Sequence, residues 1–408
     1  MKKVMIIGAG AGQVPIIELA KRHGLFTLVV SPFVPYPGIG LGDKHICEDI
    51  YHIDELIRIG REEKIDYVIS DQSDYAVPIV AHIASALGLP GNAPEVAETY
   101  SYKSRFRAFC EKNGIPCPKA VTVGADSFTD DAFDGMRIPF VVKPSDSQGS
   151  RGITKVDSLS CLKDAINYAA QYSRQGKVVV EEYFRGREVV CEGFIYKGEY
   201  RNVSFGDRVY FDIEGKFIPS ETIFPSTLDE EYKKAIVKNE EKITSLLRPS
   251  FGIVHSEYLV ADDGSFAVVE SALRGGGVYI ASHLIPFSCG VDLTELLMDA
   301  MLGDDEGVRK RLSSSSKGAA GYMCFYLKEG VVTSIRGAEE VSSIPGVEIA
   351  EIQNIHVGDR IPRFEHKGMR KGPFIMRALS LDELGSVVDR IRKTLQIDID
   401  GRQGIVWI

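Results

Sequence analysis

At 408 residues the chain is too long for one compact core, so two to four domains are expected. A content of 44% hydrophobic and 26% charged residues is ordinary for a globular protein, and no apolar run approaches the ~18 residues of a membrane span. The formal charge of −9 and the lack of a basic stripe argue against a nucleic-acid partner, because phosphate neutralisation needs clustered Lys and Arg.

The first ninety residues alternate short apolar runs with helical patterns. The pattern predicts strands at 4–7, 27–30 and 67–69, and helices at 14–23, 53–63 and 77–87. Strands that alternate with helices indicate βαβ units and a parallel sheet covered on both faces. Leu89-Pro90-Gly91 then closes this unit.

The rest of the chain predicts mixed elements. Helices are predicted at 102–113, 158–173 and 230–247, and strands at 140–143, 178–181, 253–260 and 266–270. Alternating apolar residues over 188–223 are typical of an antiparallel sheet. A polar stretch at 313–317 indicates a linker, followed by a small α/β unit that ends with a helix at 381–395.

The cysteines indicate a reducing compartment. They are odd in number, scattered, and form no C-x-x-C pair: Cys47, Cys110, Cys117, Cys161, Cys191, Cys289 and Cys324. This pattern suits buried or free thiols and not a disulfide framework or a zinc site. Residues 4–7 follow Met1 almost directly, without an apolar signal region, so we expect a cytoplasmic protein.

A glycine-rich turn follows the first strand, at Gly8-Ala9-Gly10. A dinucleotide fingerprint would need a third Gly or Ala where Gln13 stands, and an acidic residue where the second strand ends at Ser31. Since both are missing, we interpret the turn as structural, or as one wall of a substrate pocket at the carboxyl ends of the strands.

A second loop has the composition of a phosphate-binding loop. Lys143 ends a strand and precedes a Gly/Ser-rich segment at 145–152. Backbone N–H groups of such a segment can approach phosphate oxygens, and the lysine supplies a point charge. No P-loop pattern is present, and taken alone the segment could equally be a flexible surface loop.

Two carboxylates, Glu257 and Glu270, lie on strands joined by a short turn, so their side chains can face each other. Their burial is costly unless they bind a cation, and Mg²⁺ is the fitting one because it takes oxygen ligands shared with phosphates. Arg274 follows, where it could stabilise charge on a transferred phosphoryl group. A salt-bridged hairpin is the alternative interpretation.

The order of these motifs closely resembles the ATP-grasp superfamily. A helix lysine precedes the Lys143-Pro144 loop, then Glu181-Glu182-Tyr183-Phe184, and finally Glu257 and Glu270-x-x-x-Arg274-Gly-Gly. The last unit, with Gly330-Val331-Val332 and Arg370-Lys371-Gly372, is similar to that of the biotin-carboxylase-like and L-amino-acid-ligase branches.

The resemblance implies an α/β and α+β fold class and a division into four parts. These are a pre-ATP-grasp (Rossmann-like) parallel α/β domain at 1–95, a two-part ATP-grasp body at 96–180 (with the phosphate loop) and 181–312 (catalytic), and a small C-terminal α/β domain at 319–408.

The resemblance also implies roles for individual residues. Lys103 and Lys143 would contact ATP phosphates; Glu181, Glu182 and Phe184 would hold adenine; and Glu188 would bind the ribose. Glu257 and Glu270 would hold Mg²⁺, with Mn²⁺ as an alternative. Arg274, with Lys143, would be catalytic. The loop that closes over the phosphates would contribute Ser147, Gly149, Ser150 and Gly152.

The implied activity is that of an ATP-dependent carboxylate–amine ligase, with another nucleophile as a variant, that forms an acyl phosphate and releases ADP and phosphate. Its partners would be a small carboxylate and an amine, and many relatives imply a homodimer. The closest enzymatic rival is a purine-pathway ligase of the phosphoribosylglycinamide synthetase type. Ala272 stands where the family usually has Asn, which supports a degenerate ATP-binding protein as the other alternative; water or Ser271 could fill that gap.

The substrate pocket is predicted from position alone. Candidates are the first-domain segment 70–74 and, after the glycine run, Ser282, His283 and Pro286. For His255 and His283 we favour a hydrogen-bonded structural role over that of a base.

Overall fold

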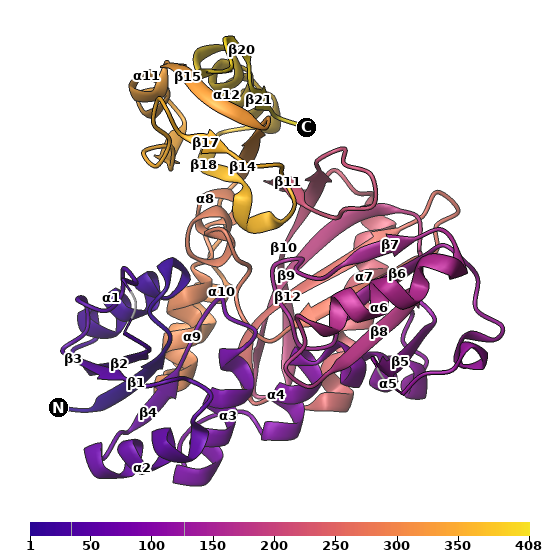
Figure 1. Ribbon diagram of the computed structural model, residues 1–408. Helices are drawn as coiled ribbons and strands as arrows, with labels where there is room; N and C mark the ends of the chain where they lie inside the picture. Colours follow the sequence, from indigo (N-terminus) through magenta and orange to yellow (C-terminus); the bar gives the residue numbers. More distant parts are fainter. Residues whose placement is uncertain (34, 126) are drawn as a thin grey trace.

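The structure is a computed structural model that describes residues 1–33, 35–125 and 127–408. Its strands form four sheets in this part of the chain (Figure 1). In Figure 1 the N-terminal sheet lies at the lower left, the sheet of β5–β8 at the right and the C-terminal elements at the top.

The N-terminal sheet is parallel, as predicted. Its order is β3-β2-β1-β4, and its strands are β1 (Lys3–Ile7), β2 (Phe26–Ser31), β3 (Lys44–Cys47) and β4 (Tyr67–Ile69). Helices α1 (Val14–Arg22), α2 (Ile53–Glu63) and α3 (Ala76–Leu87) connect and cover it. β1 and β4 run side by side, so the Gly-rich turn and segment 70–74 leave the same edge of the sheet.

One strand of this sheet was not predicted. β3 lies at the sheet edge, and of its residues only Ile46 is buried. A short edge strand with polar neighbours carries no apolar run, so the sequence pattern gives no signal for it.

The second sheet is antiparallel, in the order β5-β8-β6-β7. Its strands are β5 (Ala120–Gly124), β6 (Phe140–Pro144), β7 (Thr154–Val156) and β8 (Lys177–Glu182), and α6 (Leu162–Ala170) packs on one face. The Gly/Ser-rich segment connects β6 to β7 and projects from the end of this sheet.

The largest sheet follows the order β13-β12-β9-β10-β11-β14-β18-β16, with β21 added to β14. The predicted alternation over 188–223 is confirmed as three antiparallel strands. The strands are β9 (Arg187–Tyr196), β10 (Glu199–Tyr210), β11 (Pro219–Phe224), β12 (Phe251–Val260), β13 (Phe266–Ala272), β14 (Ala319–Leu327), β16 (Val347–Ala350), β18 (Lys371–Ala378) and β21 (Ile405–Val406).

β14 pairs with β11, so this sheet continues across the predicted boundary between 312 and 319. The fourth sheet contains β15 (Gly330–Arg336), β17 (Arg360–Ile361), β19 (Gln396–Ile399) and β20 (Arg402–Gln403). The division into four domains stays a prediction.

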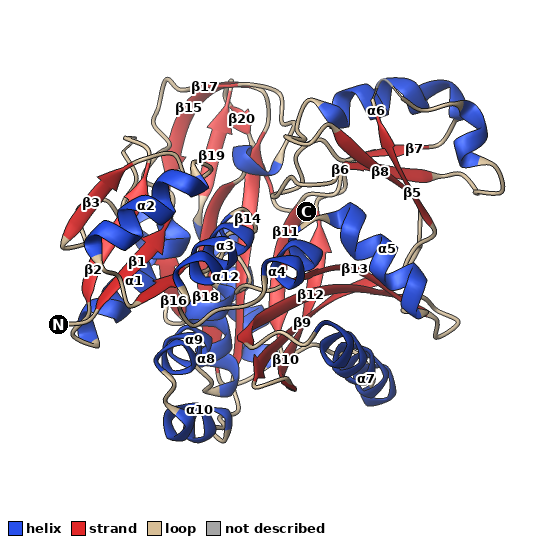
Figure 2. Cartoon of the chain, turned by 90° about the horizontal axis from the view of Figure 1, so that it is seen from below, coloured by secondary structure: helices blue, strands red, loops and turns tan. Residues whose placement is uncertain are grey.

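The remaining helices surround the large sheet (Figure 2). They are α4 (Pro94–Ser101), α5 (Lys103–Asn113), α7 (Glu230–Leu247), α8 (Ile285–Cys289), α9 (Leu293–Leu302), α10 (Asp305–Leu312), α11 (Ala338–Ser342) and α12 (Leu381–Thr394). In the described ranges, no helix has both the length and the apolar character needed to cross a membrane.

α7 shows why the predicted helices form. Glu230 and Glu231 lie in its first turn, where negative charge is stabilised by the helix dipole. Ile236 and Ile243 lie two turns apart on one face and are fully buried in a cluster with residues of β9, β10, β12 and β13. The apolar face of the helix therefore covers the large sheet.

This packing predicts a stability loss for Ile236→Ala. Removal of the buried side chain should lower the free energy of unfolding by about 2–5 kcal/mol, because transfer and cavity terms add. Urea unfolding followed by circular dichroism measures it, with exposed Lys234→Ala as the control. Equal effects of the two substitutions would contradict the packing described here.

Candidate active site

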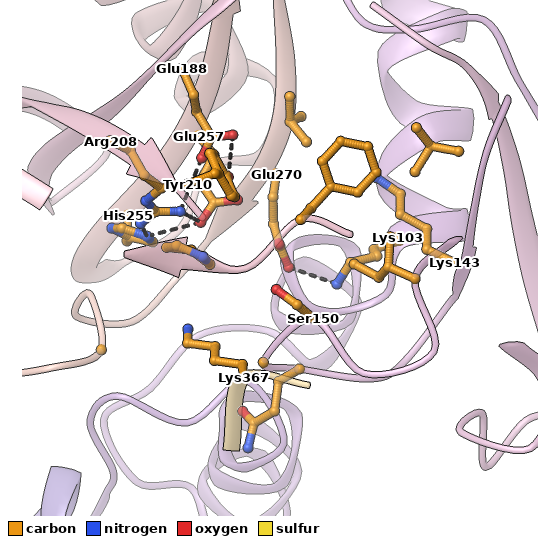
Figure 3. A pocket seen from close by; sticks show the side chains of 18 of the residues that line it. Lys103, Lys143, Ser150, Glu188, Arg208, Tyr210, His255, Glu257, Glu270 and Lys367 are labelled. Atoms are coloured by element: carbon orange, nitrogen blue, oxygen red, sulfur yellow. Dashed lines mark hydrogen bonds and ion pairs between the residues drawn. The ribbon is translucent and has the colours of Figure 1, made fainter. Parts of the chain in front are cut away.

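A cavity of 770 Å³ lies where the second sheet, the large sheet and the end of the N-terminal sheet meet (Figure 3). Every predicted site residue except Gly152 lines it, although these residues come from distant parts of the chain. They are Lys103, Lys143, Ser147, Gly149, Ser150, Glu181, Glu182, Phe184, Glu188, Glu257, Glu270 and Arg274.

Gly152 is buried at the base of the loop instead. Its φ is +72°, and a Cβ there would lie 2.8 Å from Tyr172 and 3.0 Å from Pro144. A larger residue would therefore displace the loop from the second sheet.

The two predicted metal carboxylates face each other. Glu257 on β12 is in register with Glu270 on β13. Lys103 forms a 2.7 Å ion pair with Glu270 and also donates to the Ser147 carbonyl at 3.1 Å. The carboxylates thus meet the chemical requirement for a hard divalent cation, and in this structure protein cations balance their charge.

The cation beside Glu257 is Arg208 of β10, which the sequence analysis missed. Its guanidinium donates to Glu257 and, at 3.1 Å, to Glu188. Tyr210 donates to the other oxygen of Glu188. Arg208 is the central cation of a row of side chains on one face of the large sheet (Figure 3).

The single positive charge of Arg208 cannot fully balance the negative charges of both Glu188 and Glu257. Burial, reinforced by the charge of Glu257, raises the pKa of Glu188 to about 7. Burial would also raise the pKa of Glu257, but Arg208 and then His255 outweigh it and hold that pKa well below its usual range. Glu188 is therefore the carboxylate of this pair that takes up a proton.

Lys143 belongs to a second buried group of charges. Glu181 accepts from Lys143 at 2.8 Å and from Arg107 at 2.7 Å, and all three side chains are almost inaccessible. Burial raises the pKa of Glu181, but the two cations outweigh it and leave that pKa below its usual range. Burial lowers the pKa of Lys143.

The segment predicted to hold adenine, residues 181–184, begins with the carboxylate of this ion pair. The Glu181 carboxylate is paired with cations, and the Glu182 carboxylate accepts from the Arg137 backbone at 3.0 Å. The backbone N–H groups of Glu182 and Tyr183 donate to the carbonyls of Lys119 and Pro139 at 2.9 and 2.8 Å. Phe184 lines the same wall of the cavity.

Arg274 is held by the N-terminal unit. Asp74, which follows β4, accepts from Arg274 Nε at 2.8 Å and from Nη2 at 3.0 Å. The next residue, Gly275, donates its N–H to Asp71 at 2.9 Å, and a Cβ at Gly275 would lie 2.6 Å from that carboxylate. Segment 70–74, predicted as a substrate wall, therefore also orients the arginine.

The same segment contacts the Gly/Ser-rich loop. The Asp74 N–H donates to the Gln148 side chain at 3.2 Å. Asp74 thus touches both the loop and Arg274, and it connects the first unit to the other two walls of the cavity.

Ala272 and Ser271 are placed differently from each other. Ala272 is buried in register with His255, and the Ser271 hydroxyl is buried and accepts from Ser256 at 2.9 Å. Alternate residues of a strand point to opposite faces, so Ser271 points away from the face that carries Glu270. The suggestion that Ser271 fills the gap left by Ala272 is therefore wrong.

The burial and hydrogen bonding of His255 agree with the structural role expected for it. It is 3% exposed, and its Nδ1 is bonded to the fully buried Glu192. Burial lowers its pKa, but the charge of Glu192 outweighs this and leaves the pKa raised. The imidazole lies between the carboxylates of Glu192 and Glu257.

Ser282 and His283, which were predicted to line the substrate pocket, lie outside the main cavity. Ser282 and His283 line a separate cavity of 530 Å³ beside α1, with Ser282 bonded to His283 Nδ1 at 2.9 Å. Burial lowers the pKa of His283. The position of these residues gives them no part in the main cavity.

Comparisons with known proteins bear on the fold. Residues 109–276 match the family model described as the D-Ala D-Ala ligase C-terminus. The alanine–anticapsin ligase of Bacillus subtilis is 22% identical over 61% of this chain, and the chain spans 56% of that relative's length.

Two solved structures cover nearly the whole chain. An L-amino acid ligase from Bacillus licheniformis has a TM-score of 0.81 at 24% identity and covers 98% of this chain and 99% of its own. A phosphoribosylglycinamide synthetase from Anaerococcus prevotii has a TM-score of 0.75 at 18% identity, with 98% and 100% covered. These likenesses confirm the predicted fold class.

The raised pKa of Glu188 predicts a pH-dependent stability. The folded protein keeps a proton on Glu188 up to about pH 7, whereas the unfolded chain releases it near the ordinary value of 4.5. Unfolding is then favoured as the pH rises through that window. In metal-free buffer, wild type should lose stability relative to Glu188→Gln between about pH 4.5 and 7.

Urea midpoints of the two proteins across this pH range measure the effect. Exposed Glu199→Gln is the control and should show no such trend relative to wild type. A difference between wild type and Glu188→Gln that is constant with pH would contradict the assigned protonation.

Proposed function

Because the chain has the ATP-grasp fold, we propose that it is an ATP-dependent ligase that joins a small carboxylate to an amine. The acid would be activated as an acyl phosphate, with ADP and phosphate as products. The main support is the facing pair Glu257 and Glu270, set in one cavity with Lys103, Lys143 and Arg274. The names of the matched relatives add to it, since they include amino-acid ligases.

The proposed nucleotide site uses the wall between the two sheets. Lys103 and Lys143 would contact the phosphates, together with the loop residues Ser147, Gly149 and Ser150. Each lysine now faces a carboxylate, which arriving phosphates would replace as the counter-charge. Glu181 would keep its ion pair with Arg107, whereas Glu270 would need another partner.

Mg²⁺ would be that partner for Glu270, with Glu257 as the other ligand and Mn²⁺ as an alternative. Bound there, the ion would neutralise phosphate charge. Ala272 has no side-chain oxygen, so the two carboxylates would be the only protein ligands of the metal ion.

Arg274 would stabilise charge on the transferred phosphoryl group. Asp74 orients its guanidinium through two hydrogen bonds, and among the described residues Nη1 is bonded only to the Gly275 carbonyl, at 3.0 Å. Closure of segment 147–152 would exclude water, which would otherwise hydrolyse an acyl phosphate. The cytoplasmic location and the homodimer stay predictions.

Substrate-dependent ADP release tests the proposal. Purified protein with ATP and Mg²⁺ is incubated with pools of amino acids, other carboxylates, amines and aminoribonucleotides. Release that needs one carboxylate and one amine would establish a ligase, and release that needs an aminoribonucleotide would favour the purine-pathway type. Bound ATP without ADP from any pool would favour the degenerate ATP-binding protein, for which Ala272 is the specific observation.

Glu270→Gln should lower turnover at least about 100-fold, because one of two proposed metal ligands is lost. ADP release under the conditions that support wild-type turnover measures it. Exposed Asp263→Asn, in the turn of the same hairpin, is the matched control. Unchanged activity of Glu270→Gln would remove the metal assignment.

A further inference from the structure

A smaller cavity of 290 Å³ adjoins the main one. Both are lined by Gln72, Gly277, Val278, Lys367 and Arg370. It lies between the Gly-rich turn after β1, the turn after Arg274 and the segment that leads into β18, with Cys324 of β14 and Glu351 after β16 completing the wall. Its size suits a small chemical group.

The cations that surround the main cavity differ in their partners. Lys103, Lys143, Arg208 and Arg274 each form an ion pair with a carboxylate. Lys367 forms no hydrogen bond or ion pair through its ammonium group with any residue in 1–33, 35–125 or 127–408. Figure 3 shows this ammonium pointing into the cavity, on the side that faces His255 and Arg208.

The charges around Lys367 make it unusual that its ammonium group has no partner among the described residues. Burial, and then the charges of Arg370 and Arg208, lower its pKa to about 8. Such a group is still mostly protonated at neutral pH. The charge of Glu257 opposes the effect of these cations on the pKa but does not cancel it, so the approach of an anion to Lys367 is favourable.

Arg370 adds a second donor. Its Nη1 donates to the Pro219 carbonyl and its guanidinium lies 5.9 Å from the centre of the Tyr322 ring, which together fix the side chain. Its Nε is buried and has no partner among the described residues. A donor fixed in place without an acceptor is a rare and costly feature of a folded protein.

Gln72 adds a third donor from the N-terminal unit. Its side-chain amide nitrogen is likewise buried and without a partner among the described residues. Its backbone has a φ of +57°, which is unfavourable for a residue with a side chain, and its N–H is held by Asp71 at 2.8 Å. The chain thus keeps this amide at the junction of the two cavities.

The one carboxylate that lines the smaller cavity does not balance these donors. Glu351 is exposed at its outer wall, where it accepts from the Tyr279 hydroxyl at 2.7 Å. The lining of the smaller cavity therefore carries two cations, Lys367 and Arg370, against the single carboxylate of Glu351.

We propose that Lys367, Arg370 and Gln72 bind a second anionic group of a substrate, a carboxylate or a phosphate, apart from the group that reacts. The substrate class is then a small acid with two anionic groups. Its identification as a substrate, and not only as a ligand, rests on the proposed ligase function.

Binding of matched anions tests the proposal without turnover. Succinate and 2-phosphoglycolate carry two anionic groups, and butyrate matches succinate with only one. Calorimetry on the wild-type protein should give a Kd for one of the two dianions at least about tenfold below that for butyrate, as expected for one added charge-assisted hydrogen bond. The tighter dianion tells whether the second group is a carboxylate or a phosphate.

Lys367→Gln should abolish this advantage, and Lys367→Arg, which keeps the charge, should retain it. Arg363→Gln is the control, because Arg363 is an exposed cation of the same segment that lines neither cavity. Three outcomes would overturn the proposal: no measurable binding of either dianion, equal affinity for dianions and butyrate, or an advantage that survives in Lys367→Gln.

A weakened affinity for a non-hydrolysable ATP analogue in Lys367→Gln, with succinate binding unchanged, would also overturn it, because Lys367 would then contact ATP phosphates. Failure of the ligase proposal is distinguishable from these outcomes, since the anion titrations contain no ATP and ADP release is measured separately.

Discussion

The cavity depends on one constraint: ions removed from water must be balanced by other ions. Lys143 and Glu181 are 4% and 3% exposed, and Arg208 and Glu188 are 7% and 9% exposed. Each would be strongly unfavourable alone, so every one of them is held against an opposite charge. The site is therefore built so that an incoming ligand exchanges one set of ionic partners for another.

These ion pairs also fix how the sheets meet. Lys103 on α5 reaches Glu270 on β13, and Arg274 reaches Asp74 beyond β4, across 167 and 200 residues of sequence. Asp74 contacts the Gly/Ser-rich loop as well. The position of the loop, the charge on the large sheet and the orientation of Arg274 are thus physically connected, as closure around the two substrates of the proposed ligase would require.

Local patterns were enough to predict most of this architecture. The short turn placed the strands of Glu257 and Glu270 side by side, because a hairpin is a local feature. Strict alternation from the turn would put Val269 opposite Glu257; a β-bulge between Glu257 and Tyr258 shifts the register and brings Glu270 there instead. The roles of Arg208 and Lys367 in the site could not be predicted, because each depends on packing between distant segments. Segment 70–74 was predicted as a pocket candidate, but the pairing of Asp74 with Arg274 was not. Ser271 was misjudged for a local reason, since its strand position already places it on the face opposite Glu270. Edge strand β3 lacked an apolar run altogether.

The proposed ligase activity requires Glu257 and Glu270 to hold a metal ion that nucleotide phosphates share. The most direct test is the affinity of the wild-type protein for a non-hydrolysable ATP analogue, measured by calorimetry with Mg²⁺ and with EDTA. We expect Mg²⁺ to strengthen binding at least about tenfold, since without the ion the phosphates would face these carboxylates directly. Equal affinity with and without Mg²⁺, or no nucleotide binding at all, would contradict this proposal.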